Sequence, residues 1–167
     1  MKFKPVSLND WQEVFTILTT AVAFLAEQGI NQWQNNYPNQ ATVFQDIQKQ
    51  VSYQLVDENK ILAVAVLNTE AEANYRKIES GTWQNNGKYA TIHRFAVNQA
   101  YQGRGIGKSM FQALIQQAQQ LGFNDLRVDT HPDNLVMQQL ILKNGFTYRG
   151  IVYMSDNSQR LAYQRLL

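Results

Sequence analysis

The sequence predicts an α/β (α+β) fold, a single domain over residues 1–167 in which about seven strands form one sheet flanked by helices. Apolar residues alternate or run together over short stretches, and between these stretches they recur at helical spacing. Two pairs of strands are joined by short polar turns, Asp57–Lys60 and Asp156–Ser158, which indicates β-hairpins and a largely antiparallel sheet. No repeat, linker or change of composition divides the chain.

The elements are predicted in the order strand, two helices, three strands, helix, strand, helix and two strands. Ser7 and Asp10 form a capping-box pattern before the first helix, and Gly29 is suited to end it. The segment 69–80 has no clear period and is predicted to be irregular or helical, then extended, and Asn85-Asn86-Gly87 in the segment 81–88 indicates a turn. The expected strands are 2–6, 51–56, 61–67, 89–97, 126–130, 147–154 and 159–166, and the expected helices begin at residues 11, 42, 106 and 135.

Composition excludes several classes of protein. Hydrophobic residues at 44% and charged residues at 17% are typical of a globular domain. A net charge of +2 without a run of Lys or Arg predicts no nucleic-acid partner. The absence of cysteine excludes disulfides, thiolate nucleophiles and cysteine-based metal sites. Because there is neither an N-terminal apolar signal nor a long apolar run, we expect a cytoplasmic protein with no membrane partner.

The most informative stretch runs from His93 to Ser109 and reads HRFAVNQAYQGRGIGKS. It begins as an apolar strand, passes through a glycine-rich loop and opens directly into an amphipathic helix. This arrangement aims backbone N–H groups at a phosphate, and Arg104 and Lys108 add positive charge at the same end. The sequence therefore predicts a ligand that carries phosphate.

Three known phosphate-loop patterns can be compared with this stretch. A P-loop phosphotransferase is indicated only by Gly107-Lys108-Ser109, because Gln102 stands where the first glycine is required. A dinucleotide fingerprint fails at its third glycine, where the chain has Lys108. The pattern [QR]-x-x-G-x-[GA] between a strand and a helix is satisfied in full by residues 102–107, QGRGIG.

That pattern resembles the pyrophosphate loop of the GNAT superfamily of acetyl-CoA-dependent N-acetyltransferases. Between about residues 90 and 150 three further features match the family: Ala96-Val97 at the strand end, Asn134 at the start of the last helix and Gly145-Phe146 at its end. The resemblance implies a mixed, mostly antiparallel sheet with a splay between the strands that end near Val97 and Thr130. It also implies transfer of acetyl from acetyl-CoA, as co-substrate and without a metal, to an amine in a ternary complex.

The resemblance also implies which residues bind the co-substrate. In the family, the loop amides hold the pyrophosphate and the preceding strand pairs with the pantetheine arm, which places an oxyanion donor near Val97. An asparagine contacts the same arm, although Asn134 also fits a role as helix cap alone. The expected cofactor-binding residues are Phe95, Ala96, Val97, Gln102, Gly103, Arg104, Gly105, Ile106, Gly107, Lys108, Ser109 and Asn134.

His93 is the first candidate for a catalytic base. It precedes Phe95 by two residues, so the strand pleat predicts that both lie on one face, near the expected thioester. A primary amine with a pKa of about 10.4 is mostly protonated at neutral pH, and a histidine is suited to deprotonate it. Some members of the family carry a histidine here, and others have a glutamate two residues earlier, where this chain has Thr91. A half-buried structural histidine is the alternative.

Two further catalytic residues are expected. His131 follows a strand that should lie across the splay from His93, and a structural turn histidine before proline is the alternative. Asp129 is a candidate to orient a histidine or to act as a second base. The family often has a tyrosine that acts as general acid at the position where this chain has Ile141. Tyr153 in the terminal hairpin, or a water molecule, is therefore expected to protonate the leaving thiolate.

The sequence narrows the partners less sharply. Trp33, Tyr37, Tyr75 and Trp83 fall in segments that border the acceptor pocket in the family, which predicts aromatic walls around a small-molecule amine or a peptide N-terminus. The alternative to an enzyme is a non-catalytic sensor or interaction module that binds CoA or acyl-CoA. The terminal hairpin offers a strand edge at which a homodimer can form.

Overall fold

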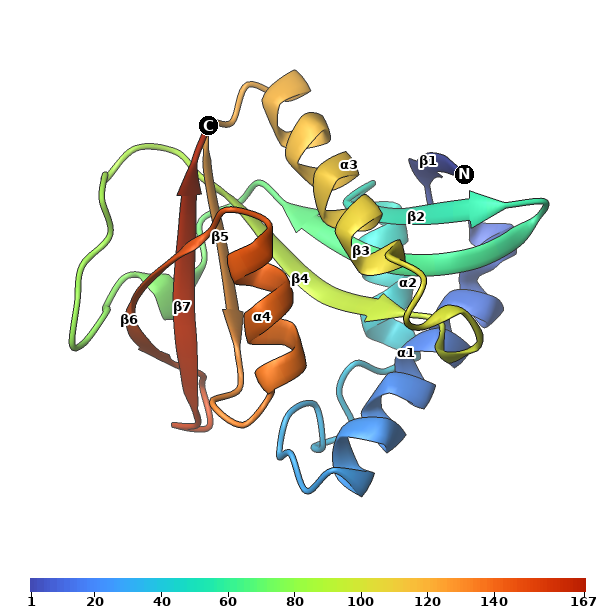
Figure 1. The fold of residues 1–167 in the computed structure, drawn as a ribbon, viewed down its shortest axis with the longest axis horizontal. Coiled ribbons are helices and arrows are strands. Elements are labelled where there is room, and N and C mark those ends of the chain that lie inside the picture. The colour runs from blue at the N-terminus through green and yellow to red at the C-terminus, as the bar shows by residue number, and fades with distance from the viewer.

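The computed structural model describes residues 1–167 and contains one seven-stranded sheet in the order β1-β2-β3-β4-β5-β7-β6 (Figure 1). Neighbouring strands are antiparallel except β4 and β5, which are parallel. The predicted α+β class and the mixed, mostly antiparallel sheet are confirmed. The strands are β1 (Lys2–Pro5), β2 (Ser52–Asp57), β3 (Lys60–Asn68), β4 (Ala90–Val97), β5 (Asp125–Thr130), β6 (Thr147–Tyr153) and β7 (Gln159–Leu166).

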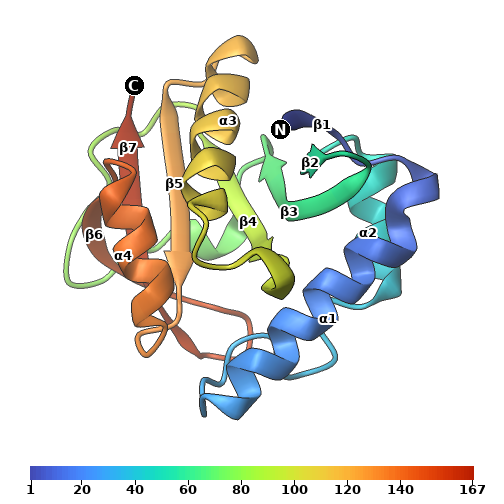
Figure 2. The same ribbon diagram turned by 45° about the vertical axis from the view of Figure 1, so that its right-hand side comes forward.

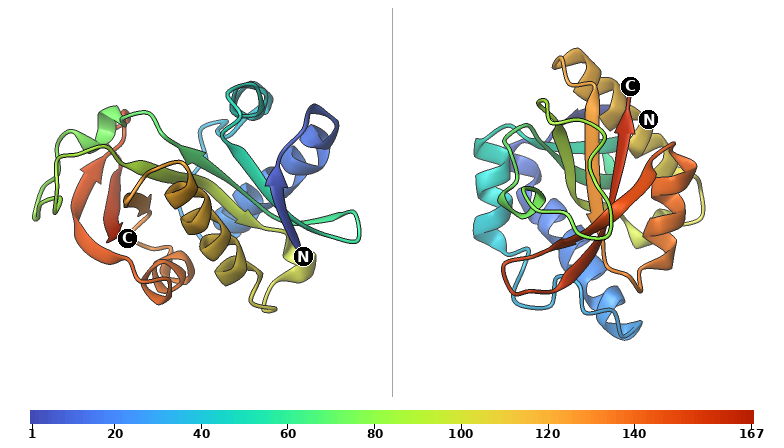
Figure 3. Two further views of the ribbon diagram at one scale, coloured as in Figure 1. Left: turned by 90° about the horizontal axis from the view of Figure 1, so that it is seen from above. Right: turned by 90° about the vertical axis from the view of Figure 1, so that its left-hand side faces the viewer.

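Helices cover both faces of this sheet: α1 (Trp11–Glu27) and α2 (Gln40–Gln48) on one, α3 (Ile106–Gln120) and α4 (Leu135–Lys143) on the other (Figure 3). The larger core cluster, of 19 buried residues, joins the sheet to α3 and α4. Met110, Phe111 and Leu114 of α3 are fully buried in it. A cluster of 9 buried residues lies under α1 and α2. None of the helices combines the length and the apolar character that crossing a membrane requires.

Local hydrogen bonds explain where the first two helices begin. The Ser7 backbone N–H and hydroxyl both donate to Asp10 Oδ2, at 3.0 and 2.7 Å, which confirms the predicted capping box. One turn of 3₁₀ helix, Leu8–Asp10, leads into α1. The second helix begins two residues before its predicted start, because Asn39 caps it by accepting a 3.0 Å hydrogen bond from the Thr42 N–H.

β4 contains a bulge beside β3. Ala96 pairs with Val64 and His93 with Val66, so β4 has one more residue than β3 between these two pairs. Arg94 within the bulge adopts a left-handed backbone with φ +48°. The extra residue interrupts the two-residue alternation of side chains.

The bulge overturns one prediction about the face of β4. Phe95 packs against the larger core cluster beneath α3, with its ring centroid 4.7 Å from that of Phe111. Ile92, three residues earlier, belongs to the same cluster. His93 instead bonds Glu72, in the segment between β3 and β4, and does not share the face of Phe95. The prediction that His93 and Phe95 lie on one face is therefore wrong, because it assumed an unbroken pleat.

The predicted splay between β4 and β5 is confirmed. The two strands pair only over Ala90–Ile92 and Leu126–Val128. Beyond Ile92, β4 continues to Val97 without a partner on this side, while β5 stays paired with β7 as far as Thr130. Figure 2 shows the two strands parting towards the end at which α3 begins.

The segment between β3 and β4 folds across the free edge of the terminal hairpin. A 3₁₀ turn at Ala73–Tyr75 starts it, and Glu79 then exchanges two 2.8 Å backbone hydrogen bonds with Ile151 of β6. A Cβ on Gly81 would lie 1.8 Å from the Arg149 carbonyl oxygen, so the chains touch where only glycine fits. The edge considered for a homodimer is thus partly covered by the chain itself.

Candidate active site

A cavity of about 1230 Å³ lies where β4 and β5 part. Its walls come from the loop between α1 and α2, the second half of β4, the glycine loop, the end of β5 and the start of α4. Two groups of polar residues face it. One is the glycine loop at the start of α3, and the other surrounds His93. The fold therefore brings the predicted phosphate loop and the predicted base into one cavity.

The glycine loop presents a row of unpaired donors. Gly103 and Gly105 both have φ +76°, the left-handed conformation that glycine adopts without strain. The backbone N–H groups of residues 103–108 donate to no acceptor in the protein, and the first one that does is Ser109, to the Gly105 carbonyl at 3.1 Å. Lys108 and Lys143 line the same cavity. Unpaired N–H groups at a helix N-terminus, with two cations, form a site suited to an anion.

Close packing places this helix start against its neighbours. A Cβ on Gly107 would lie 3.0 Å from Leu140 Cδ2 of α4 and 3.6 Å from Val97 Cγ2 of β4. Gly107 thus lets α3 begin directly beside both elements. Ten of the predicted cofactor-binding residues line the cavity: Phe95, Ala96, Val97, Gln102, Gly103, Gly105, Ile106, Gly107, Lys108 and Asn134.

Arg104 and Ser109 do not line the cavity. The Arg104 guanidinium lies over the Tyr101 ring at 5.7 Å, and Ser109 Oγ donates back to the Gly105 carbonyl at 3.4 Å. Each of these two side chains therefore contacts a residue of the loop itself. Their backbone positions remain part of the loop.

Asn134 caps α4 and also faces the cavity. Its Oδ1 accepts a 3.1 Å hydrogen bond from the Met137 N–H, and its Nδ2 donates to Gln32 Oε1 at 3.2 Å. Gln32 is buried in the loop between α1 and α2, and its Oε1 also accepts from the His131 N–H at 3.5 Å. Gln32 therefore ties that loop to the turn before α4. Sequence analysis missed this residue, since nothing distinguishes it among the many glutamines.

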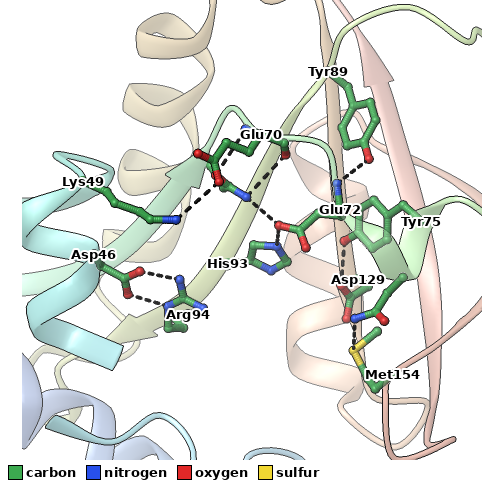
Figure 4. A network of polar contacts seen from close by, with 12 residues as sticks. Asp46, Lys49, Glu70, Glu72, Tyr75, Tyr89, His93, Arg94, Asp129 and Met154 are labelled. Atoms are coloured by element: carbon green, nitrogen blue, oxygen red, sulfur yellow. Dashed lines mark hydrogen bonds and ion pairs between the residues drawn. The ribbon is translucent and has the colours of Figure 1, made fainter. Parts of the chain in front are cut away.

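His93 is held by a glutamate that sequence analysis also missed (Figure 4). Its Nε2 lies 2.7 Å from Glu72 Oε1, which also accepts from Asn68 Nδ2 at 2.7 Å. The Glu72 backbone N–H donates to Tyr89 Oη at 2.8 Å. Burial raises the pKa of Glu72, but the contacts with His93 and Asn68 outweigh it and lower the pKa overall. Glu72 lies in the segment without a sequence period, so no local pattern marked it.

Asp129 is bound by Tyr75 and hydrogen-bonds neither histidine. The buried Tyr75 hydroxyl donates to Asp129 Oδ2 at 2.6 Å. Burial and the Asp129 carboxylate together hold the pKa of Tyr75 well above its usual value. The Tyr75 ring lies 5.3 Å from the Trp83 ring and 6.4 Å from that of His93. The expected role of Asp129 in orienting a histidine therefore does not match its contacts.

Arg94, in the bulge, fixes one aromatic wall. Its guanidinium makes two hydrogen bonds, of 2.7 and 2.6 Å, to Asp46 of α2 and a third to the Tyr37 hydroxyl. Tyr37 and Trp33 line the cavity as expected. Trp83 does not line the cavity, because its ring packs against Arg127 of β5, with the guanidinium carbon 4.2 Å from the ring centroid. Tyr75 is buried in the core and does not line the cavity either. Two of the four expected aromatic residues thus border the cavity.

Of the remaining catalytic candidates, Asp129 lines the cavity, whereas His131 and Tyr153 do not. His131 turns back on its own loop, where Nδ1 accepts from the Asp133 N–H at 3.1 Å and burial lowers the pKa of the imidazole. Tyr153 stands at the end of β6, where its hydroxyl accepts from Gln159 Nε2 at 3.3 Å. Ile141 is fully buried in the core beneath α4. Of the three predicted catalytic side chains, only His93 faces the cavity.

Comparison with known proteins identifies the family. A family model described as the acetyltransferase (GNAT) family matches residues 11–146. The chain belongs to the GNAT acetyltransferase family. It is thus an acyltransferase of a family that uses acetyl-CoA and an amine acceptor, and the P-loop phosphotransferase alternative falls away. A search of curated proteins finds no match.

Solved structures share the fold over nearly the whole chain. A GNAT acetyltransferase from Streptococcus agalactiae is 28% identical, with 99% of this chain and 95% of that chain covered and a TM-score of 0.92. A GNAT acetyltransferase from Listeria monocytogenes is 16% identical, with coverages of 99% and 94% and a TM-score of 0.77. A protein from Salmonella typhimurium, solved with its cofactor acetyl-CoA, is 15% identical, with coverages of 99% and 93% and a TM-score of 0.72.

Proposed function

We propose that this GNAT acetyltransferase moves the acetyl group of acetyl-CoA to the amine of a small molecule or to a peptide N-terminus, by direct attack in a ternary complex. One observation carries the proposal. The glycine loop, whose N–H groups at residues 103–108 are unpaired, lines the same cavity as His93. An anion receptor and a proton acceptor in one cavity are what transfer from a pyrophosphate-bearing thioester to an amine requires.

The residues present fit acetyl-CoA. The donors of residues 103–108 suit its pyrophosphate, and Lys108 and Lys143 add charge for phosphate oxygens. Beyond Ile92, β4 has a free backbone edge towards β5, which suits the amide groups of the pantetheine arm. When bound, acetyl-CoA supplies the activated thioester. Phe95, Ala96, Val97 and Asn134 line the space between these two regions.

His93 is the proposed base. A primary ammonium with a pKa of about 10.4 must lose a proton before it attacks, at a cost of about 4–5 kcal/mol at neutral pH. His93 takes this proton directly or through water, and the amine nitrogen then forms a bond to the thioester carbon. The carbon–sulfur bond breaks, and the thiolate leaves. Because Tyr153 and His131 do not line the cavity, we assign protonation of the thiolate to water.

Calorimetric titration with acetyl-CoA, CoA and ATP tests the co-substrate site. Wild-type protein is expected to bind acetyl-CoA and CoA more tightly than ATP. Gly105→Glu should weaken acetyl-CoA binding by about 100-fold or more, because it sets a carboxylate among donors meant for a phosphate and strains a backbone at φ +76°.

Gly122→Glu is the matched control. Gly122 has a similar φ of +80° but lies at the opposite end of α3, outside the cavity walls. This variant should retain binding, which separates loss of the site from loss of the fold. Tighter binding of ATP, or unchanged acetyl-CoA binding by Gly105→Glu, would contradict the proposal. Thiol release in a screen of amines then identifies the acceptor.

A further inference from the structure

We propose that Glu72 is a positioning residue that holds His93 with its proton on Nε2, so that Nδ1 accepts the proton of the acceptor amine. This inference deepens the proposed function and rests on it. It concerns a residue outside the glycine loop and outside β4. The observation behind it is the 2.7 Å contact between His93 Nε2 and Glu72 Oε1.

The chemistry of the pair selects the tautomer. An ionised carboxylate only accepts hydrogen bonds, so Nε2 of a neutral His93 must be the nitrogen that donates. Nδ1 then carries the lone pair, and no group in the protein hydrogen-bonds to it. Both side chains are 22% exposed and line the cavity. The arrangement leaves the proton-accepting nitrogen free for a substrate.

Glu72 is itself fixed from two sides. Asn68, at the end of β3, donates to the same Oε1, and Tyr89, just before β4, accepts from the Glu72 backbone N–H. These contacts hold the carboxylate beside β4. Glu72 is thereby placed to support the imidazolium that forms when Nδ1 gains a proton, as a buried carboxylate does for a catalytic histidine.

Other charged and titratable groups surround the imidazole at longer range. Glu72 is the group that hydrogen-bonds a ring nitrogen directly. Tyr75 lies 6.4 Å away, ring to ring, and the Asp129 carboxylate is bound by the Tyr75 hydroxyl. On the side of α2, Asp46 and Arg94 neutralise each other. The groups that face His93 are thus Glu72, Tyr75, Asp129, Asp46 and Arg94 (Figure 4).

Kinetics of Glu72→Gln test the role. The amide can turn its N–H towards Nε2 and so favour the opposite tautomer, as when an asparagine replaces a catalytic aspartate. We expect kcat with the best amine to fall by about 100-fold, while KM for acetyl-CoA stays within about twofold. Glu72→Asp keeps the charge and should recover part of the rate.

Glu70→Gln is the matched control. Glu70 lies two residues away, bonds Lys49 and is exposed, so its loss should leave the rate unchanged. Equal losses in Glu70→Gln and Glu72→Gln would overturn the proposal. A rise in acetyl-CoA KM without a fall in kcat would overturn it too, since it would place Glu72 in binding.

Nitrogen-15 NMR of the two imidazoles gives a readout that needs no turnover. His131→Asn assigns the signals, because the chain has only two histidines. Wild-type His93 should show the Nε2–H tautomer, and Glu72→Gln should shift it towards Nδ1–H. The Nδ1–H tautomer in the wild type would overturn the inference. If the tautomer follows Glu72 but no amine is acetylated, the proposed function fails while the positioning contact stands.

Discussion

One extra residue in β4 decides what His93 faces. Without the bulge at Arg94, the two-residue period would place His93 on the side of Phe95, inside the apolar cluster beneath α3. With the bulge, the imidazole reaches Glu72 and the cavity. The same bulge points Arg94 at Asp46 of α2 and so anchors Tyr37 in the cavity wall. A single backbone irregularity therefore arranges several side chains of the site.

Replacement of His93 tests its role as base. We expect His93→Gln to lower kcat by about 100-fold or more, because it keeps polarity but removes the proton acceptor. KM for acetyl-CoA should change little. Tyr153→Phe is the comparison, and it should leave kcat unchanged because the Tyr153 hydroxyl lies outside the cavity. Initial rates of thiol release measure both, and a large loss in Tyr153→Phe would return the acid role to that residue.

At the scale of elements, the glycine loop and helix α3 together form the proposed anion site. The loop leaves the N–H groups of residues 103–108 unpaired, and the helix behind it aligns their dipoles. Gly107 lets this end of the helix pack against β4 and α4. The receptor is therefore formed mostly by backbone, so substitutions that keep the backbone path should be tolerated at Arg104, whose side chain lies outside the cavity.

The start of α1 is a second element whose local chemistry has a measurable effect. Asp10 Oδ2 accepts a 2.7 Å hydrogen bond from Ser7 Oγ and another of 2.7 Å from Gln54 Nε2 of β2. It thus caps the turn before α1 and ties that turn to the sheet. Burial raises the pKa of Asp10, but these hydrogen bonds outweigh it and lower the pKa below its usual 3.8.

Asp10→Asn should lower the free energy of unfolding by about 1 kcal/mol at neutral pH, because hydrogen bonds to a carboxylate are stronger than those to an amide oxygen. A carboxyl whose pKa is lower in the folded state stabilises it above the unfolded pKa, and loses that effect as pH falls through the folded value. The difference between the two proteins should therefore shrink below pH 3.8. Urea unfolding at neutral and acid pH measures it, with the exposed Glu27→Gln at the other end of α1 as control. A difference independent of pH would contradict the assignment.

On the scale of the whole molecule, the segment between β3 and β4 connects the site to the far edge of the sheet. Its first part carries Glu72 and Tyr75, which contact His93 and Asp129. Its next part bridges β6 through Glu79 and Gly81. One stretch of chain thus contacts both the hairpin edge and the proposed base. A substitution that disrupts the contact with β6 should therefore disturb the side chains of the cavity.

Gly81→Ala tests this connection. The new Cβ would meet the Arg149 carbonyl oxygen at 1.8 Å, so the segment must lift from β6. We expect a loss of about 1–3 kcal/mol in stability, and concentration-dependent association through the uncovered edge. Calorimetry and sedimentation velocity measure the two effects. Gly87→Ala is the control, because its nearest neighbour is an Asn85 side-chain atom at 3.6 Å. Unchanged stability in Gly81→Ala would contradict the close contact.

The sequence by itself determined the features that depend on residues close together in the chain. Residues 102–107, the apolar periods of the helices and the polar hairpin turns act over a few positions, so the phosphate loop, the class of fold and the family could be predicted from them. Only the tertiary structure decided the catalytic surroundings. Glu72 and His93 are 21 residues apart and Asp46 and Arg94 are 48 apart, and each pair meets only because the sheet and its bulge bring them together. His131 and Tyr153 have suitable chemistry and directly follow or end strands that reach the cavity, but neither residue lines it, whereas their neighbours Thr130 and Met154 do.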